Sequence, residues 1–431
     1  MPKPNPVSVN SSPTSTPLSL AIVGAGPAGL ALALLAAQLL PQARISLFDA
    51  RPLDRDVSGD PRTLALALGS VQLLQRLGVW DAAHAQAIAQ VRVSQAPPTL
   101  QHPVFGSSQE PEVLISAAEQ GVAQLGAVLS YGQLVAPMQA AWQARVEREP
   151  QRLFSHFGAP VQGIKPLADA GVEVDAGIAE RFDLAVVAEG GVFSDQARKA
   201  ITHDYQQNAW VGTVTLADDS PAGVAYERFT RNGPLALLPL KPLTTNGQSQ
   251  RRAALVWCMP KSEDEVAGLS DAQRLLVIQH LLPASVGQLQ AISPLKCFAL
   301  GLNAERTLVD GCTVRIGNAA QTLHPVAGQG LNLGLRDAYA LVEALRSATN
   351  SSSGDSQTSN WASLVQTALR QVEWNRAPDR WTTIAATDFL AKTFAWRWPG
   401  LPLARGLALA ALQALPPLKR TVARSMMFGR R

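Results

Sequence analysis

Residues 18–49 read LSLAIVGAGPAGLALALLAAQLLPQARISLFD, and this stretch decides the fold class. An apolar run ends in a G-x-G-x-x-G turn, an apolar helical pattern follows, and a second apolar run closes at Asp49. Strand, glycine-rich turn, helix and strand in this order predict a βαβ unit, whose two strands lie parallel in one sheet. The sequence therefore predicts an α/β fold that begins near Leu18.

The three glycines have the spacing that a dinucleotide-binding turn requires. Gly24 permits the tight turn, Gly26 lets the backbone approach a pyrophosphate, and Gly29 lets the helix pack closely on the strand. Asp49, at the end of the second strand, is placed to accept a hydrogen bond from a ribose hydroxyl. The structural alternatives are a glycine-rich turn without a ligand and an Asp49 that only forms a turn.

The composition is typical of a globular protein with a basic tail. The chain has 431 residues, of which 47% are apolar, enough for a large core and for two or three domains. Its formal charge is +4, but eight Lys or Arg and no acid follow Asp388. These cations lie in an apolar tail without a recognition motif, which argues against a nucleic-acid partner. Three widely spaced cysteines indicate a reducing compartment, and neither a disulfide framework nor a zinc site.

Two N-terminal segments need to be distinguished from targeting signals. Residues 18–40 contain no charged side chain, so hydropathy alone would mark them as membrane-spanning. We reject that interpretation, because glycines and a proline break the apolar run where a strand should turn into a helix. Residues 1–17, rich in Ser and Pro, fit a secretory signal poorly and are predicted to be a disordered leader.

Further strand patterns predict a second sheet. Apolar runs in residues 182–190 and 312–320 predict two more buried strands for the parallel sheet. Residues 209–259 differ, because they hold the short strand patterns VGTVTLA, VAYERFT, GPLALLPL and AALVWCM, separated by turn residues. These patterns predict an antiparallel sheet that forms a separate substrate domain. The low-complexity residues 347–360 predict a flexible connection before a C-terminal region of helical patterns.

A second glycine-rich loop carries a family resemblance. Residues 317–345 read GNAAQTLHPVAGQGLNLGLRDAYALVEAL, a strand end, a glycine-rich loop and a helix that begins near Leu331. Its HP, GQG, LNLG and RDA motifs resemble the second flavin motif of the FAD-dependent aromatic hydroxylases, in their ubiquinone-biosynthesis branch. Other segments that resemble this family are residues 60–80, 233–240, 255–257, 387–390 and 415–420.

The resemblance implies an architecture. It is a Rossmann-like FAD-binding domain with an inserted, mainly antiparallel β-sheet substrate domain and a C-terminal helical region. In the implied division, a leader at 1–17 precedes an FAD-binding domain that consists of two segments, 18–200 and 297–346. The first segment also contains some substrate-domain elements, around 86–110. The substrate domain lies between these segments at 201–296, and a linker at 347–360 leads to the helical region at 361–431.

The resemblance also implies the chemistry. FAD would be held noncovalently and reduced by NADH or NADPH, and O2 would then hydroxylate the ring of a polyprenyl phenol in ubiquinone biosynthesis. Because the cofactor carries this chemistry, no catalytic triad and no metal site are expected. Pro325 would pack near the isoalloxazine, and Gly328, Gln329 and Gly330 would line the side that reacts with oxygen. The residues predicted to bind the cofactor are Gly24, Gly26, Pro27, Ala28, Gly29, Asp49, Arg62, Glu189, Gly190, Gly317, Asn318, Gly330, Leu331 and Asn332.

Three positions depart from the family pattern. Asn318 stands where an Asp usually holds a ribityl hydroxyl; Asn still accepts that hydrogen bond but lacks the charge assistance. Glu189 replaces an Asp in the segment EGGVFSDQAR, whose Ser194 and Arg198 arrive later than in the family. Residues 110–125 are expected to form a helix of the family in which an Arg commonly opens the helix and contacts FAD. This segment contains no Arg.

Three further residues are weighed on the resemblance. Arg62 would reach the flavin or its phosphates. Gln321 stands where the branch often has His. His324 is either a functional residue or a hydrogen-bonded anchor of the loop.

The tail after Asp388 has two interpretations. One is a core-packing helix that ends in solvated cations. The other is peripheral membrane contact, since Trp396, Trp398 and the cations suit an anionic lipid interface, where a polyprenyl substrate would reside. Four prolines in the tail argue against a single span across the bilayer. We therefore expect a cytoplasmic protein, which the second interpretation places on the inner face of the cytoplasmic membrane.

Two other functions stay open. The same scaffold could hydroxylate a soluble aromatic compound in catabolism. A flavin-poor relative could instead serve as a structural subunit of a ubiquinone-biosynthesis complex, because a fold does not guarantee a preserved site. The departures at Glu189, Asn318 and residues 110–125 motivate this last alternative.

Overall fold

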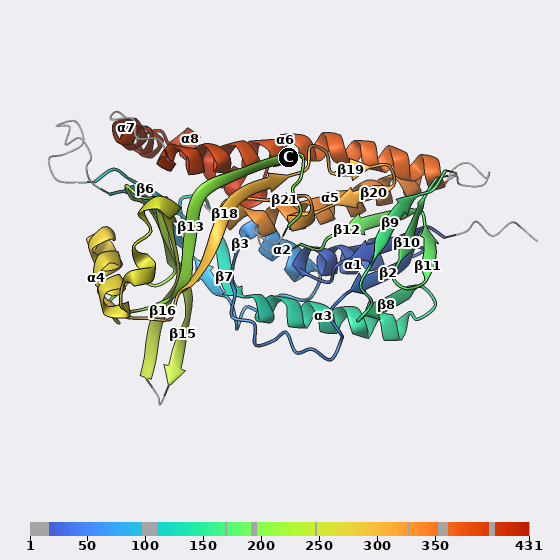
Figure 1. The fold of residues 1–431 in the computed structure, drawn as a ribbon, viewed down its shortest axis with the longest axis horizontal. Coiled ribbons are helices and arrows are strands. Elements are labelled where there is room, and N and C mark those ends of the chain that lie inside the picture. Colours follow the sequence, from blue (N-terminus) through green and yellow to red (C-terminus); the bar gives the residue numbers. More distant parts are fainter. Residues whose placement is uncertain are drawn as a thin grey trace, which may run out of the picture.

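The computed structural model describes residues 17–96, 110–168, 170–190, 196–245, 248–325, 328–351, 361–395 and 401–430. They form two large sheets, which occupy opposite halves of the molecule in Figure 1. A long helix, α6 (Trp361–Ala395), runs along one edge over both halves (Figure 1). The α/β fold class predicted from the sequence is confirmed.

The first sheet is mostly parallel. Its strand order is β19-β20-β12-β1-β2-β8, and only the pair of β19 and β20 is antiparallel. The strands are β1 (Ser19–Val23), β2 (Arg44–Asp49), β8 (Leu153–Phe157), β12 (Leu184–Val187), β19 (Val309–Asp310) and β20 (Thr313–Arg315). The apolar runs at 182–190 and 312–320 thus supply β12 and β20, as predicted.

Helix α1 (Pro27–Leu39) accounts for the charge-free segment near the start of the chain. It begins with Pro27, whose fixed φ suits the first helical position. It packs on β1 and β2 and against α3 (Tyr131–Arg148) and α5 (Gln329–Ser351). All residues from Ala28 to Ala37 are buried, so the helix is apolar on every face. In the part of the chain that the structure describes, no helix is both long and apolar enough to cross a bilayer.

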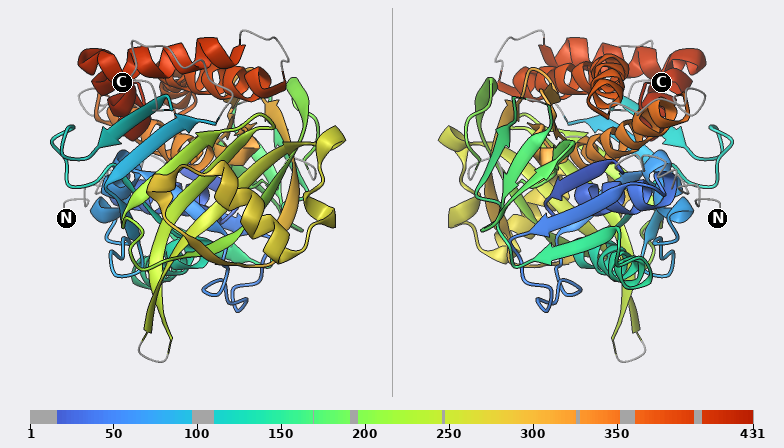
Figure 2. Two further views of the ribbon diagram at one scale, coloured as in Figure 1. Left: turned by 90° about the vertical axis from the view of Figure 1, so that its left-hand side faces the viewer. Right: turned by 90° about the vertical axis from the view of Figure 1, so that its right-hand side faces the viewer.

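The second sheet is mainly antiparallel. Its strand order is β21-β18-β13-β16-β15-β14-β5-β6, and β17 pairs with β13 beside this path. The strands are β5 (Gln90–Gln95), β6 (Glu112–Ser116), β13 (Ile201–Leu216), β14 (Val224–Phe229), β15 (Pro234–Thr245), β16 (Gln248–Pro260), β17 (Leu289–Ile292), β18 (Lys296–Ala304) and β21 (Gln321–Thr322). Helix α4 (Asp271–Leu281) covers one face of this sheet (Figure 2, left). Because β18 pairs with β13, the sheet continues past residue 296, where the substrate domain was predicted to end.

Smaller elements complete the fold. Strands β3 (Thr63–Ala67), β4 (Gln86–Ile88) and β7 (Gly126–Ser130) form a short sheet. Helix α2 (Leu68–Arg76) follows β3 directly in the chain. A second short sheet contains β9 (Gly163–Pro166), β10 (Val172–Asp175) and β11 (Ala179–Phe182). Helices α7 (Leu401–Ala414) and α8 (Pro416–Phe428) pack against each other, with α7 on β6 and α8 on α2.

Two expectations differ from the structure. Residues 110–125 do not form the expected family helix, because β6 occupies Glu112–Ser116, pairs with β5 and is followed by a turn. Val113 and Ile115 alternate into the core there, which favours a strand over a helix. Helix α5 continues to Ser351, so residues 347–351 of the predicted flexible connection are helical. The rest of that connection and residues 1–16 of the leader lie outside the described residues.

Candidate functional site

The turn between β1 and α1 is held by contacts that only glycine permits. Gly24 has a φ of +105°, and a Cβ on Gly29 would lie 1.9 Å from the carbonyl oxygen of Gly24. Gly26 is different, because the nearest atom to its added Cβ would be Tyr131 Oη, at 3.9 Å. The backbone at the start of α1 therefore faces open space, where its amides can hold an anion.

Asp49 ties this turn to the end of β2. Its Oδ2 accepts a hydrogen bond from the Ala25 amide at 2.6 Å, and its Oδ1 accepts one from the Arg51 amide at 2.8 Å. The Arg51 guanidinium donates to the Ala25 carbonyl at 3.1 Å, which closes the ring of contacts. The carboxylate predicted to bind a ribose thus lies at the turn, with a cation beside it that the sequence analysis missed.

These groups border a cavity of about 400 Å³ at the carboxyl ends of β1, β2, β12 and β20. Twelve of the fourteen residues predicted to bind the cofactor line it, and they are Gly24, Gly26, Pro27, Ala28, Asp49, Arg62, Glu189, Gly190, Gly317, Asn318, Gly330 and Leu331. Gly29 lies beneath the turn, and Asn332 borders a neighbouring cavity. The lining residues that the sequence analysis missed are Arg51, Leu64, Tyr131, Ala188 and Gly334.

Two departures from the family pattern meet at one wall of this cavity. A Cβ on Gly190 would lie 2.5 Å from Asn318 Cβ, so the two segments touch. Burial, and to a smaller extent the charge of Asp49, raises the pKa of Glu189. The neutral Asn318 adds no third negative charge to this wall. Ser194 lies outside the described residues, and Arg198 is exposed.

Arg62 supplies a cation at the rim of the cavity. Its guanidinium lies 4.0 Å from the ring centroid of Tyr131 and 2.7 Å from Asp60. The hydrogen bond to Asp60 raises the pKa of Arg62, so the side chain stays charged. Tyr131 is the first residue of α3, and Ser130 caps that helix. No Arg opens α3, and Arg62, the residue that precedes β3, brings a cation to the first turn of α3 instead.

A second cavity, of about 370 Å³, adjoins the first across β3 and the start of α5. Pro325, Gly328 and Gln329, three of the predicted catalytic residues, border the second cavity, whereas Gly330 borders the first. The GQG loop is therefore part of the wall between a polar cavity and an apolar one. The apolar lining includes Ile88, Val91, Val93, Ile115, Phe229, Leu238, Val256, Leu390, Leu409, Leu412, Val422, Met426 and Met427.

Asn332 holds this wall together. Its Oδ1 accepts hydrogen bonds from the Ala67 amide and the Ser70 hydroxyl, both at 2.7 Å. Its Nδ2 donates to the carbonyls of Ala65 and Gly328, at 3.0 and 2.9 Å. Because these four bonds join α5 to β3, α2 and the GQG loop, Asn332 positions the wall.

The C-terminal helices close the second cavity. Leu409, Ala423 and Met427 are buried in the same core as Ile88 and Phe229, as the core-packing interpretation of the tail predicts. The opposite surface of these helices remains apolar and basic, with Leu407, Leu415, Leu418, Arg420 and Arg424 exposed. Trp396 and Trp398 lie outside the described residues.

His324 and Gln321 are engaged in buried contacts away from both cavities. His324 Nε2 lies 3.1 Å from Gln207 Oε1, and burial lowers the pKa of His324 to about 4. Gln321 accepts a hydrogen bond from Arg380 at 2.7 Å and donates one to Asp337 at 3.3 Å. These contacts favour His324 as an anchor of its loop.

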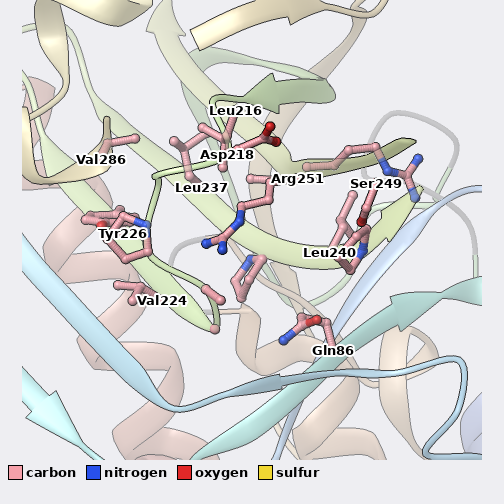
Figure 3. A pocket seen from close by; sticks show the side chains of 17 residues that line it. Gln86, Leu216, Asp218, Val224, Tyr226, Leu237, Leu240, Ser249, Arg251 and Val286 are labelled. Carbon is pink, nitrogen blue, oxygen red and sulfur yellow. The ribbon is translucent and has the colours of Figure 1, made fainter. Parts of the chain in front are cut away.

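A third cavity, of about 350 Å³, opens at the base of the hairpin of β15 and β16. Figure 3 shows Arg251 reaching into it between Val224 and Leu240. The Arg251 guanidinium donates a hydrogen bond to the Ser220 carbonyl. None of the residues predicted from the sequence lines this cavity.

Comparison with known proteins agrees with this geometry. A family model described as an FAD binding domain matches residues 202–376. The 3-demethoxyubiquinol 3-hydroxylase of Escherichia coli is 29% identical over 416 residues, which cover 94% of this chain and 97% of that protein. Ubiquinone hydroxylase UbiL of Rhodospirillum rubrum is 29% identical over 379 residues, which cover 85% and 80%.

A solved structure shows the same fold. PqsL, a probable FAD-dependent monooxygenase from Pseudomonas aeruginosa, matches with a TM-score of 0.66 at 16% identity, over 91% of this chain and 99% of that one. The match covers 91% of this chain, so the fold of two halves is shared.

Proposed function

Because the chain belongs to the FAD-dependent aromatic hydroxylases, in the branch of ubiquinone biosynthesis, we propose that it hydroxylates the aromatic ring of a polyprenyl phenol. FAD is the cofactor, NADH or NADPH the proposed reductant, and O2 the proposed source of the hydroxyl oxygen. The relatives named for acting on ubiquinone precursors support the substrate class.

One observation carries the proposal, namely the two adjoining cavities of opposite character. The first is lined by glycine turns, carboxylates and Arg62, which suit a dinucleotide. The second is lined mainly by aliphatic side chains, which suit an apolar ring with a polyprenyl chain. The GQG loop and β3 stand between them, where a bound cofactor and a substrate ring would meet.

The residues of the first cavity fit FAD. The glycine turn and α1 would hold the pyrophosphate, Asp49 a ribose, and Glu189, Gly190 and Asn318 the ribityl chain. When bound, FAD supplies hydride acceptance and oxygen activation. The chain's own groups orient it: Asn332 fixes the wall, and the apolar second cavity excludes water from the ring.

The test uses purified protein supplied with excess FAD, NADH or NADPH, and a farnesylated phenol. We expect near-stoichiometric FAD and ring hydroxylation, with kcat/KM at least roughly 100-fold higher than for the same phenol without the chain, since each buried CH₂ contributes about 0.8 kcal/mol and the burial of about four such groups already gives that factor. Equal rates on both phenols would favour a soluble aromatic substrate. Failure to hold FAD in excess would refute the hydroxylase assignment.

The exposed side of α7 and α8 supports peripheral membrane contact, which we propose as the route to a polyprenyl substrate. Leu407, Leu415 and Leu418 are 47%, 51% and 48% exposed, beside the exposed Arg420 and Arg424. The same helices line the second cavity with Leu409 and Met427, among others. A protein docked by this surface would have its apolar cavity next to the lipid. Such a position on the inner face of the cytoplasmic membrane would also suit a ubiquinone-biosynthesis complex.

Replacing Arg420 and Arg424 by glutamine is expected to weaken binding to vesicles that contain phosphatidylserine by roughly 30-fold, because each cation near the surface contributes about 1 kcal/mol. Co-sedimentation measures the change, and FAD content should be unaltered. The matched control replaces Arg55 and Arg148, which are exposed elsewhere, in the same way. Equal loss in both double variants would show that net charge, and not this surface, governs binding.

A further inference from the structure

Among the described residues that line the second cavity, one is acidic, Glu227. Strand β14 alternates, so Ala225, Glu227 and Phe229 share the face toward this cavity. On the opposite face the Tyr226 hydroxyl donates to the Ser285 carbonyl at 2.8 Å. Glu227 pairs in register with Val93 of β5 and Ala236 of β15. An acid therefore occupies an inward position where its neighbours on the same face are apolar.

No charged group on the described residues neutralises Glu227. Its side chain has no hydrogen bond or ion pair to any residue within the described ranges. The adjacent Arg228 points the other way and binds the Leu281 carbonyl at 3.0 Å, the Ser94 hydroxyl at 3.1 Å and Glu110. An acid that is desolvated without a partner costs stability, which is typical of groups kept for function.

The other titratable residues that border the cavity cannot supply a charge. Cys258 lies on β16, and burial, together with the charge of Glu227, raises the pKa of its thiol far above the neutral range. Burial also raises the pKa of Tyr226, so that hydroxyl stays protonated. The GQG loop and helices α6, α7 and α8 contribute amide and apolar side chains to the wall. Glu227 is thus the only described group on this wall that can exchange a proton near neutral pH.

We propose that Glu227 is the catalytic base of this site and accepts the proton of the ring hydroxyl of a phenol bound in the second cavity. This inference rests on the proposed function and deepens it. The O–H bond of the ring hydroxyl breaks, its electron pair stays on the ring oxygen, and the proton bonds to a carboxylate oxygen of Glu227. The step needs no oxidant or reductant.

The step has a consequence for the substrate ring. A phenolate is richer in electrons at the carbons ortho and para to its oxygen than the neutral phenol is. These are the carbons that an electrophilic oxygen attacks most readily. The carbon that becomes hydroxylated should therefore lie ortho or para to the hydroxyl that Glu227 holds.

Burial suits Glu227 to this task. It raises the pKa of Glu227 to about 8. The pKa of an ordinary Glu is about 4.3, and that of the phenol of Tyr is about 10. Burial therefore brings the pKa of Glu227 closer to that of a phenol. A general base works best when its pKa is near the operating pH. Because only the ionised carboxylate takes the proton, kcat/KM should rise with pH and level off above about 8.

The variant Glu227→Gln keeps the shape of the side chain and cannot accept the proton. With FAD-loaded enzyme, NAD(P)H and a farnesylated phenol at pH 8, kcat/KM for product should fall about 100-fold. The rise with pH should disappear, while FAD content stays unchanged. Glu180→Gln, at an exposed position of β11, should keep both the rate and the pH profile. A Glu227→Gln enzyme with the wild-type rate and profile would overturn the proposal.

Binding distinguishes failure of this inference from failure of the proposed function. At pH 9 the wild-type protein should bind the farnesylated phenol roughly tenfold more tightly than its O-methyl ether, because only the phenol donates to the carboxylate. Glu227→Leu should bind the two compounds equally. If the variant still discriminates between them, Glu227 is not the acceptor, even where no turnover is seen. If wild type discriminates but hydroxylates neither compound, the proposed function fails and the acceptor role stands.

Discussion

Gly29→Ala is expected to abolish FAD binding, with the dissociation constant raised by ~1,000-fold or more. The added Cβ would lie 1.9 Å from the Gly24 carbonyl oxygen and 3.2 Å from Ala188 Cβ, so α1 must move away from β1 and β12. Forcing atoms into a packed core costs about 1–3 kcal/mol or more, and here it also displaces the amides that face the first cavity. Fluorescence titration of the FAD-free protein with FAD measures the affinity. Thermal unfolding should show a lowered Tm as well.

Gly26→Ala separates the role of the ligand from that of the fold. Gly26 has a φ of −77°, and its added Cβ would have no neighbour closer than 3.9 Å, so the FAD-free protein should keep its Tm. If the pyrophosphate approaches the backbone here, FAD affinity should still fall, by roughly 10-fold to 100-fold. Gly59→Ala, in open space, is the control for both variants. A Gly26→Ala protein with normal FAD affinity would show that the ligand does not approach this turn.

The parallel half of the fold could be predicted because its signals are local. The strand from Ser19, the turn at Gly24 and the helix from Pro27 follow each other in sequence, and each is determined by its own residues. The helix expected over residues 110–125 was wrong for the opposite reason. Its alternation at Val113 and Ile115 extends over few residues, and pairing with β5 decides its conformation.

The first cavity could be predicted better than the second. Twelve predicted residues line the first because a motif that binds a dinucleotide brings its own spacing. The wall of the second combines Ala65 on β3 with Met427 on α8, and no local pattern predicts contact between residues so far apart in sequence. Glu227 did leave a signal, since it is an acid between Ala225 and Phe229 in an alternating strand. For Asn332, no signal in the sequence distinguishes a residue that positions the wall from a residue that binds the ligand.

A buried ionic network fastens the end of the chain to α6, and its centre is Asp379. Arg336 and Arg376 both lie 2.8 Å from Asp379 Oδ2, and the Arg430 amide donates to Oδ1 at 2.8 Å. Asp379 is 2% exposed. Burial tends to raise the pKa of Asp379, but the two arginines together outweigh it, and the pKa lies below its usual value. The network therefore holds the segment after α8, a helix that lines the second cavity.

Asp379→Asn should destabilise the fold by about 3–5 kcal/mol at pH 7, because it leaves two buried guanidinium groups without their shared charge. Urea unfolding measures the loss, and amide exchange in α8 should quicken. The pKa of Asp379 is lower in the folded protein than in the unfolded chain, where it is about 4. The stability that its charge contributes is therefore complete above about pH 4 and is lost as the pH falls through the pKa of the folded state. Wild type and variant should therefore converge in stability in acid. Asp310→Asn, whose carboxylate is 78% exposed and 3.9 Å from Arg315, should change stability by less than about 0.5 kcal/mol. A gap between wild type and Asp379→Asn that persists unchanged in acid would show that packing, and not the charge, holds the tail.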